Sequence, residues 1–170
     1  MSHLQEALGG LSPPSIYAAF GSKEQLFKEA TELYVAARRS AAEREMTQAV
    51  TARDAIKTLL RCAVVGSTES GEPRGCLLVQ SAITCSASSE GVQQYLHGFR
   101  VEEQRAISKR LKAGVVNGEL PAGIDVQAMT QFYTTFVRGI AIQARDGATR
   151  ASLMDAVDCA MAVWDSFTKK

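Results

Sequence analysis

Apolar residues recur every three or four positions along most of the chain, which is the spacing of one face of an α-helix. The clearest stripes of this kind lie at residues 26–37, 56–64, 92–115, 129–140 and 153–167. Residues 76–85 are almost uniformly apolar, which predicts a short buried helix. No segment alternates in the way that a half-buried strand requires. The pattern predicts an all-α fold of about eight helices.

The first helix boundaries are marked by residues that favour helix ends. Ser12 followed by a proline predicts a helix start, because serine accepts a hydrogen bond from the first turn and proline suits the first helical position. This helix is expected to span residues 13–20 and to end at Gly21. The segment Ser22–Gln25 has the spacing of a capping box, so a long helix is expected to begin there and to reach about residue 46.

The last two long helices carry more apolar surface than one core contact needs. Residues 66–75 have the composition of a loop, and Asp125 and Thr149 are expected to cap the two closing helices. The wide apolar arc within residues 125–168 indicates a surface for a partner. A hairpin buried wholly within one subunit is the alternative.

Composition and charge exclude several classes of protein. Of the 170 residues, 46% are hydrophobic, which is enough for a core, and no apolar run is long enough for a membrane helix. The 19 basic and 18 acidic side chains leave a net charge of +1, so bulk charge alone would not hold nucleic acid. The chain also lacks the pattern of a secretory signal, and we expect a cytoplasmic protein.

Catalytic and metal-binding chemistry is poorly represented. The chain has two histidines, His3 and His97, and its four cysteines are widely spaced without a Cys-x-x-Cys pair. No phosphate-binding loop, dinucleotide-binding glycine motif or nucleophile elbow is present. We therefore expect no enzyme activity, no metal site and no cofactor.

Residues 10–27 combine a tight turn, a two-turn helix, a glycine break and a capped helix. A helix of about 12 Å fits the major groove of B-DNA. Its outward positions are small or hydroxylated, and they are Ser12, Pro13, Pro14, Ser15 and Ala18. Tyr17 adds a phenol and Lys23 a positive charge, which are groups that contact phosphates.

This segment resembles the helix-turn-helix signature of the TetR family of bacterial transcriptional repressors. The matching residues are Gly10, Leu11, Ser12, Ser15, Ile16, Tyr17, Phe20, Ser22, Lys23, Glu24 and Leu26. Pro73–Val79 and Gln143–Thr149 are similar to the regulatory domains of one branch of the family. The resemblance covers most of the chain, firmly at residues 10–27 and loosely beyond them.

The resemblance implies a DNA-binding head at residues 1–46 and an effector-binding and dimerisation domain at residues 47–170. In the head, the groove would be faced by Ser12, Pro13, Pro14 and Ser15. Tyr17 and Lys23 would contact phosphates of a double-stranded operator, and Leu11, Ile16 and Phe20 would form the core of the head.

The implied mechanism is ligand-responsive repression by a homodimer. Paired heads must lie about 34–36 Å apart to reach successive turns of DNA. A small-molecule effector that favours another spacing would release the operator, with the helix at residues 22–46 as the connection. The effector pocket is expected mainly within residues 47–120 and the dimer contact mainly within residues 125–168.

Candidate sensing residues carry an alternative interpretation in each case. The proposed pocket residues are Gln80, Tyr95, Phe99, Phe132 and Phe136, for each of which ordinary core packing is the alternative. Cys76 begins a helix and lies two residues after Arg74, and both features favour the thiolate. It is therefore a candidate thiol sensor, with a buried structural cysteine as the alternative. Cys85, flanked by serines, is a weaker candidate.

The head departs from the family pattern in length and charge. Barely ten residues precede the turn, where the family has a full helix and a basic arm. Residues 1–45 contain five basic and six acidic side chains, a net of −1, so this chain is expected to bind DNA weakly. We expect the natural protein to carry further residues before Met1, and a truncated homologue of the family is the alternative. The alternative function is a small-molecule-binding or dimerisation module that has lost DNA binding.

Overall fold

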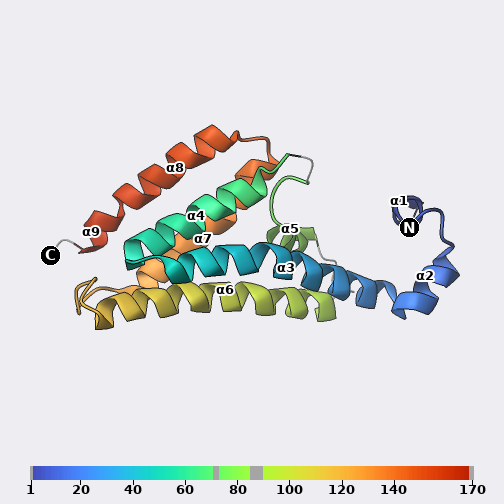
Figure 1. Ribbon diagram of the computed structural model, residues 1–170, viewed down its shortest axis with the longest axis horizontal. Helices are drawn as coiled ribbons and strands as arrows, with labels where there is room; N and C mark the ends of the chain where they lie inside the picture. The colour runs from blue at the N-terminus through green and yellow to red at the C-terminus, as the bar shows by residue number, and fades with distance from the viewer. Residues whose placement is uncertain (1, 71–72, 85–89, 169–170) are drawn as a thin grey trace. The chain divides into compact units, whose positions relative to one another are not determined.

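The computed structural model describes residues 2–70, 73–84 and 90–168, and the regular elements in these ranges are all helices (Figure 1). They are α1 (Ser2–Ala7), α2 (Pro13–Phe20), α3 (Lys23–Gln48), α4 (Ala52–Ser67), α5 (Leu77–Thr84), α6 (Glu90–Val116), α7 (Val126–Arg145), α8 (Arg150–Ala162) and α9 (Trp164–Thr168). The predicted all-α fold is confirmed. The expected closing helix is divided at Val163 into α8 and α9.

The helices form two compact units, residues 1–37 and residues 38–170. Helix α3 contributes residues to both units. The assignment of DNA binding to residues 1–46 and of sensing and dimerisation to residues 47–170 stays a prediction. None of the helices in the described ranges has the length and apolarity needed to cross a membrane.

Side-chain caps fix the starts of the helices where the sequence predicted them. The capping atoms accept from a backbone N–H three residues later, in the pairs Ser12–Ser15 at 3.3 Å, Asp125–Ala128 at 2.9 Å and Thr149–Ser152 at 3.1 Å. Thr51 caps α4 in the same way, accepting from Asp54 at 3.0 Å. Each cap contributes about 1 kcal/mol by satisfying a donor that the helix leaves unpaired.

Only half of the predicted capping box forms at the start of α3. The Ser22 hydroxyl accepts from the backbone N–H of Gln25 at 3.0 Å, as expected. The Gln25 side chain, however, donates to Glu29 Oε1 at 3.1 Å. The backbone N–H of Ser22, which the Gln25 side chain would have bonded, donates to the carbonyl of Phe20 at 2.9 Å. In a capping box the Gln25 side-chain oxygen would accept from this N–H, but the hydrogen bond to Glu29 directs the Gln25 side chain along α3 instead.

Helix α4 is the central element of the second unit, and it packs against α7, α8 and α6 (Figure 1). Its residues Ile56, Leu60 and Val64 are fully buried. Each such side chain stabilises the fold by about 2 kcal/mol through removal of apolar surface from water. The face of α4 that the sequence marked as apolar is therefore the middle of the core.

Aromatic side chains close the end of this core near the C-terminus. Tyr133 on α7 is fully buried, its ring centroid lies 5.9 Å from that of Trp164, and its hydroxyl donates to the Ala160 carbonyl at 3.4 Å. Burial raises the pKa of Tyr133 to about 12. The phenol is therefore neutral at physiological pH and serves packing.

The turn after α6 is tied to the start of α4 by a charged group. Glu119 accepts from the backbone N–H of Ala52, and it pairs with Arg110 at 3.4 Å. The hydrogen bond from Ala52, followed by the contact with Arg110, lowers the pKa of Glu119 below its ordinary value. Arg110 also donates to the Val50 carbonyl at 3.3 Å, so one carboxylate and one guanidinium join three segments.

Gly114 on α6 lies where α4 comes closest. A Cβ at this position would be 2.8 Å from the Cβ of Ala52 and 3.3 Å from Leu120 Cδ1. We expect Gly114→Ala to reduce the free energy of unfolding by about 1–3 kcal/mol, because overpacking outweighs the gain in helix propensity. Gly98→Ala on the same helix meets nothing within 4 Å and should gain up to about 1 kcal/mol. Urea unfolding of both variants measures the difference, and equal stabilities would contradict this packing.

Cys62 on α4 faces a carboxylate of α3 within the second unit. Its Sγ donates to Glu45 Oε2 at 3.3 Å, and burial together with Glu45 raises the pKa of the thiol from 9.0 to about 11. We expect iodoacetamide at neutral pH to modify Cys62 far more slowly than the exposed Cys159, because the thiolate is the reacting form. Glu45→Gln should speed the reaction at Cys62 and leave the rate at Cys159 unchanged. Mass spectrometry of the modified peptides gives both rates. Equal rates at the two cysteines in the protein without the Glu45→Gln substitution would refute the prediction.

Candidate functional site

Helix α2 in the first unit is held between two glycine turns. Gly10 and Gly21 have φ values of 84° and 75°, a region that favours glycine. The backbone N–H of Gly21 donates to the Tyr17 carbonyl at 2.7 Å and closes the last turn. The two glycine turns therefore limit α2 to two helical turns and separate it from α1 and α3.

One face of α2 is anchored and the other is exposed. Ile16 has 1% of its surface exposed and fixes the buried side. Ser12, Pro14 and Ser15 are exposed, while Pro13 is half-buried. The hydroxyls of Ser12 and Ser15 lie 2.9 Å apart, so the helix start presents a small polar surface.

The two predicted phosphate contacts lie beside this surface within the first unit. Tyr17 is half-buried next to Ile16, and Lys23 is exposed at the first residue of α3. Lys28, one turn further along α3, pairs with Glu24 at 2.8 Å. Lys23 is thus the lysine placed at the helix start, where the break after α2 leaves it accessible.

The expected core of the head is only partly correct. Ile16 is buried and Phe20 is half-buried, but Leu11 is 48% exposed. Leu11 lies in the turn before the cap of α2, and α1 offers only Leu4 as a large apolar side chain to cover it. The prediction that Leu11 forms core is therefore wrong for this structure.

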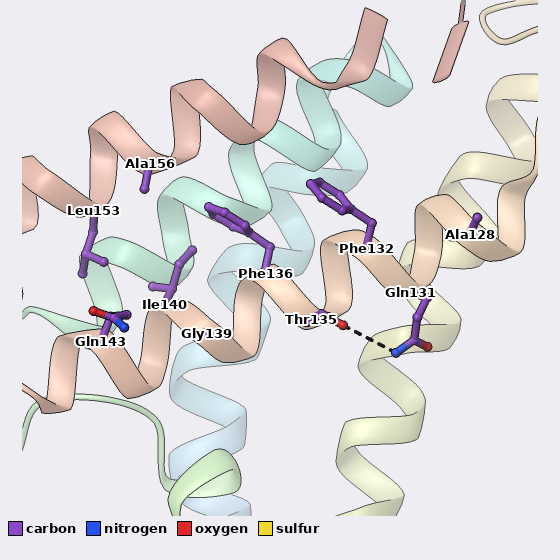
Figure 2. A pocket seen from close by; sticks show the side chains of 10 residues that line it. All are labelled: Ala128, Gln131, Phe132, Thr135, Phe136, Gly139, Ile140, Gln143, Leu153 and Ala156. Carbon is purple, nitrogen blue, oxygen red and sulfur yellow. Dashed lines mark hydrogen bonds between the residues drawn. The ribbon is translucent and has the colours of Figure 1, made fainter. Parts of the chain in front are cut away.

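A groove on the outer side of α7 and α8 contains two of the predicted pocket residues (Figure 2). It encloses about 650 Å³ and is almost entirely apolar. Its walls are formed by Ala128, Gln131, Phe132, Thr135, Phe136, Gly139, Ile140, Gln143, Leu153 and Ala156. The rings of Phe132 and Phe136 stack with centroids 6.4 Å apart and point into the space beside α8.

The other three predicted pocket residues lie on α5 and α6. Tyr95 and Phe99 meet edge to face with centroids 5.1 Å apart, and the Gln80 amide donates to the Arg74 carbonyl at 2.9 Å. The set proposed from sequence therefore divides between the groove of α7 and α8 and the α5–α6 side of the unit. Its role in binding a ligand stays a prediction.

Cys76 immediately precedes α5, and its carbonyl accepts the N–H of Gln80 at 3.0 Å. The thiol-bearing residue is partly exposed. Arg74 is engaged elsewhere, because its guanidinium donates to the Ala144 carbonyl at 2.8 Å and to the Ala148 carbonyl. The role of Cys76 as a thiol sensor stays a prediction, and Cys85 lies outside the described residues. Among the described residues, no group of three or more histidines, cysteines or carboxylates could hold a metal ion.

Sequence reasoning missed two polar residues on a face of α7 that neither packs against α4 nor lines the groove. Thr134 is completely buried, and neither its hydroxyl nor the buried Nε of Arg138 has a hydrogen-bond partner among the described residues. The two positions are one helical turn apart, so they share a face. The signal available in the sequence was an arginine four residues after a threonine, in a helix whose neighbouring positions include Tyr133 and Val137.

The chain is similar to known regulators over nearly its whole length. Residues 52–159 match the family model described as the tetracyclin repressor-like C-terminal domain. The HTH-type transcriptional repressor ComR of Escherichia coli (strain K12) is 26% identical over 172 residues, which cover 99% of this chain and 80% of ComR.

Two solved structures show the same fold. A cysteine mutant of the TetR family transcriptional regulator CifR, complexed with 26-base-pair double-strand operator DNA, is 36% identical with a TM-score of 0.91. The alignment covers 96% of this chain and 85% of CifR. A putative TetR transcriptional regulator from Rhodococcus sp. RHA1 is 31% identical with a TM-score of 0.68, covering 95% of this chain and 86% of that protein. This chain belongs to the TetR family of transcriptional regulators.

Proposed function

We propose that this protein is a ligand-responsive repressor that binds double-stranded operator DNA as a homodimer. The observation that carries the proposal is the short α2, capped at Ser12, with Ile16 buried on one side and a small polar surface exposed on the other. The operator complex of CifR, at 36% identity, supports it. The protein works in the cytoplasm and catalyses no reaction.

The exposed face of α2 reads the DNA groove. Ser12, Pro13, Pro14 and Ser15 have short side chains that allow the backbone of the helix to approach base edges closely. Tyr17 donates a hydrogen bond to a phosphate, and Lys23 neutralises one. These roles follow from the side-chain chemistry and from the exposed positions of Ser12, Pro14, Ser15 and Lys23.

A second copy of the chain covers the groove of α7 and α8. The groove presents Phe132, Phe136 and Ile140 beside the small residues Gly139 and Ala156, which permit close approach of another helix. An apolar face of this extent favours an obligate partner, and a two-fold pairing gives two heads for two operator half-sites. Phe132 and Phe136 then serve dimerisation, and effector binding falls to the α5–α6 side.

The acidic balance of residues 1–45 favours one competing function. With a net charge of −1 in this region, a dimeric ligand-binding module without DNA affinity remains the second candidate. The two functions share the dimer and differ in the role of α2, so operator binding separates them.

The dimer groove can be tested at Gly139, where an added Cβ meets nothing within 4 Å in the subunit. We expect Gly139→Glu to leave each subunit folded and to raise the dimer dissociation constant about thirtyfold or more, because a charge is buried without a partner. Gly98→Glu on α6, also open to 4 Å, is the matched control and should remain dimeric. Sedimentation over a concentration series reports both, and an unchanged dimer in Gly139→Glu would place the interface elsewhere.

The DNA interface can be tested at Lys23 through the salt dependence of operator binding. In the full-length protein, Lys23→Gln removes one phosphate contact from each of two heads, so the slope of log K against log salt should become shallower by about 2. Lys109→Gln on α6, which removes an equally exposed lysine from the second unit, should leave the slope unchanged.

Tyr17→Phe provides a second measurement at the same interface. It keeps the aromatic ring and removes only the hydroxyl, and it should weaken operator binding about fivefold to tenfold. Binding that persists unchanged in both Lys23→Gln and Tyr17→Phe would show that α2 does not contact the operator as proposed. Absence of any operator binding by the full-length protein would favour the module without DNA affinity.

A further inference from the structure

The α6–α7 seam of the second unit contains a positive charge, Arg138, with which no carboxylate of the described residues forms an ion pair. The Arg138 side chain is partly buried, and its one hydrogen bond is a long one of 3.5 Å from Nη2 to the Arg100 carbonyl. Its Nε is buried and has no acceptor, and no described carboxylate forms an ion pair with it. Burying an N–H donor of a guanidinium without an acceptor is unfavourable, so this arrangement calls for an acceptor that the described residues lack.

Thr134 adds an unused hydroxyl on the same face of α7. A buried helical threonine ordinarily donates to the carbonyl four residues earlier, and Thr130 does so to Val126 at 2.7 Å. Thr134 is more deeply buried, with no exposed surface, yet its Oγ1 makes no such bond. Its hydroxyl is therefore available to a group placed between α7 and its neighbours.

Helix α5 and helix α6 bring their own polar groups to this region. Arg100 on α6 donates through Nη1 to the Leu78 carbonyl of α5 at 2.9 Å, and its own carbonyl receives Arg138. The three helices α5, α6 and α7 pack on one another, and Arg100 contacts both of the other helices through these two hydrogen bonds. It lies on a different face of α7 from the groove lined by Phe132 and Phe136.

We propose that Arg138 and Thr134 bind the carboxylate of a small organic acid, which is the effector class of this protein. A guanidinium presents parallel N–H donors at the spacing of two carboxylate oxygens, and a hydroxyl one turn earlier donates to the same group. A monoanion matches the single guanidinium of Arg138, because that of Arg100 donates to the Leu78 carbonyl, whereas a phosphate dianion would need further cations. The apolar residues Leu77, Leu78 and Val79 of α5 accommodate the hydrocarbon part of such an acid. This inference rests on the proposed function only in that the bound acid regulates repression; the acid site itself does not require DNA binding.

The test uses linear carboxylates from butanoate to octanoate, each compared with the amide of the same length. We expect at least one acid to raise the unfolding temperature of the dimer and to change the fluorescence of Trp164, the single tryptophan, which lies beside Tyr133. The matching amide should bind about tenfold more weakly or worse, because it lacks the charge. Inorganic phosphate at the same concentration should give no protection.

Variants separate a binding role from a structural one. Arg138→Met should leave the unfolding temperature without acid unchanged or higher, since it removes an unpaired buried charge, and it should abolish protection by the acid. Arg138→Lys keeps the charge without the paired donors and should weaken binding about tenfold. Thr134→Val keeps the shape and should weaken it about threefold to tenfold. Arg105→Met, an exposed arginine of α6, is the control and should bind as the unaltered protein does.

The proposal is overturned if no acid in the series binds, if acids and amides bind equally, if phosphate protects as well as the acids, or if Arg138→Met destabilises the free protein and retains acid binding. These measurements are made on protein without DNA. Acid binding with no operator binding would therefore refute the repressor and leave the site standing. Operator binding with no acid response would refute the site and leave the repressor standing.

Discussion

The burial of α4 against α7 is the contact on which the rest of the second unit depends. Ile56, Leu60 and Val64 are fully buried in it, opposite Met129 and Tyr133 of α7. Because this contact fixes the rotation of α7 about its own axis, it also decides what the other two faces of α7 present. One of them carries Phe132, Phe136 and Gly139 into the open groove, and the other carries Thr134 and Arg138 toward α5 and α6. The packing of α4 on α7 thereby places the apolar groove and the polar residues Thr134 and Arg138 on different faces of α7.

The face of α7 that packs against α4 stabilises this arrangement, and the face that carries Thr134 and Arg138 opposes it. Three buried aliphatic side chains of α4 stabilise the fold by about 6 kcal/mol in total, as judged from buried apolar surface. An unpaired guanidinium nitrogen and an unpaired hydroxyl oppose this by a few kcal/mol. Proteins retain such losses at sites where a bound group restores the missing hydrogen bonds. The balance explains why Thr134 and Arg138 persist on a face of α7 that packs within the unit.

Rules that depend on sequence neighbours predicted the helix bounds and caps well. They did not predict which other residues would compete for the same side chain. The sequence was sufficient for the bounds of α2 and for the caps at Ser12, Asp125 and Thr149, because these depend on neighbours within one helical turn. The bond from the Ser22 N–H to the Gln25 side chain did not form, because the Gln25 side chain is engaged by Glu29, a residue that the motif does not consider. The break at Val163 between α8 and α9 had no proline or glycine to announce it.

The candidate ligand residues show the same limit at longer range. Phe132 and Tyr95 are both aromatic residues on apolar helices, and only the tertiary packing of α7 places one in the outer groove and the other on α6. Arg138 was overlooked for the converse reason, since an arginine in a helix is usually solvated and its buried Nε is visible only once α5 and α6 are in place.

The loop before α5 connects the polar interior to the end of α7. Arg74 donates to the carbonyls of Ala144 and Ala148, and the N–H of Gly75 donates to the Ser67 carbonyl at 2.9 Å. Gly75 has φ of 97°, and a Cβ there would lie 2.9 Å from the Ala141 carbonyl oxygen, so the loop approaches α7 as closely as glycine allows. The N-terminal end of α5 is thus held by α7, while its first turn receives Arg100 through the Leu78 carbonyl. A ligand held by Arg138 would act on both helices at once. It can shift the equilibrium between arrangements of α5 only by the difference in its contacts with α5 and α7 in each of them.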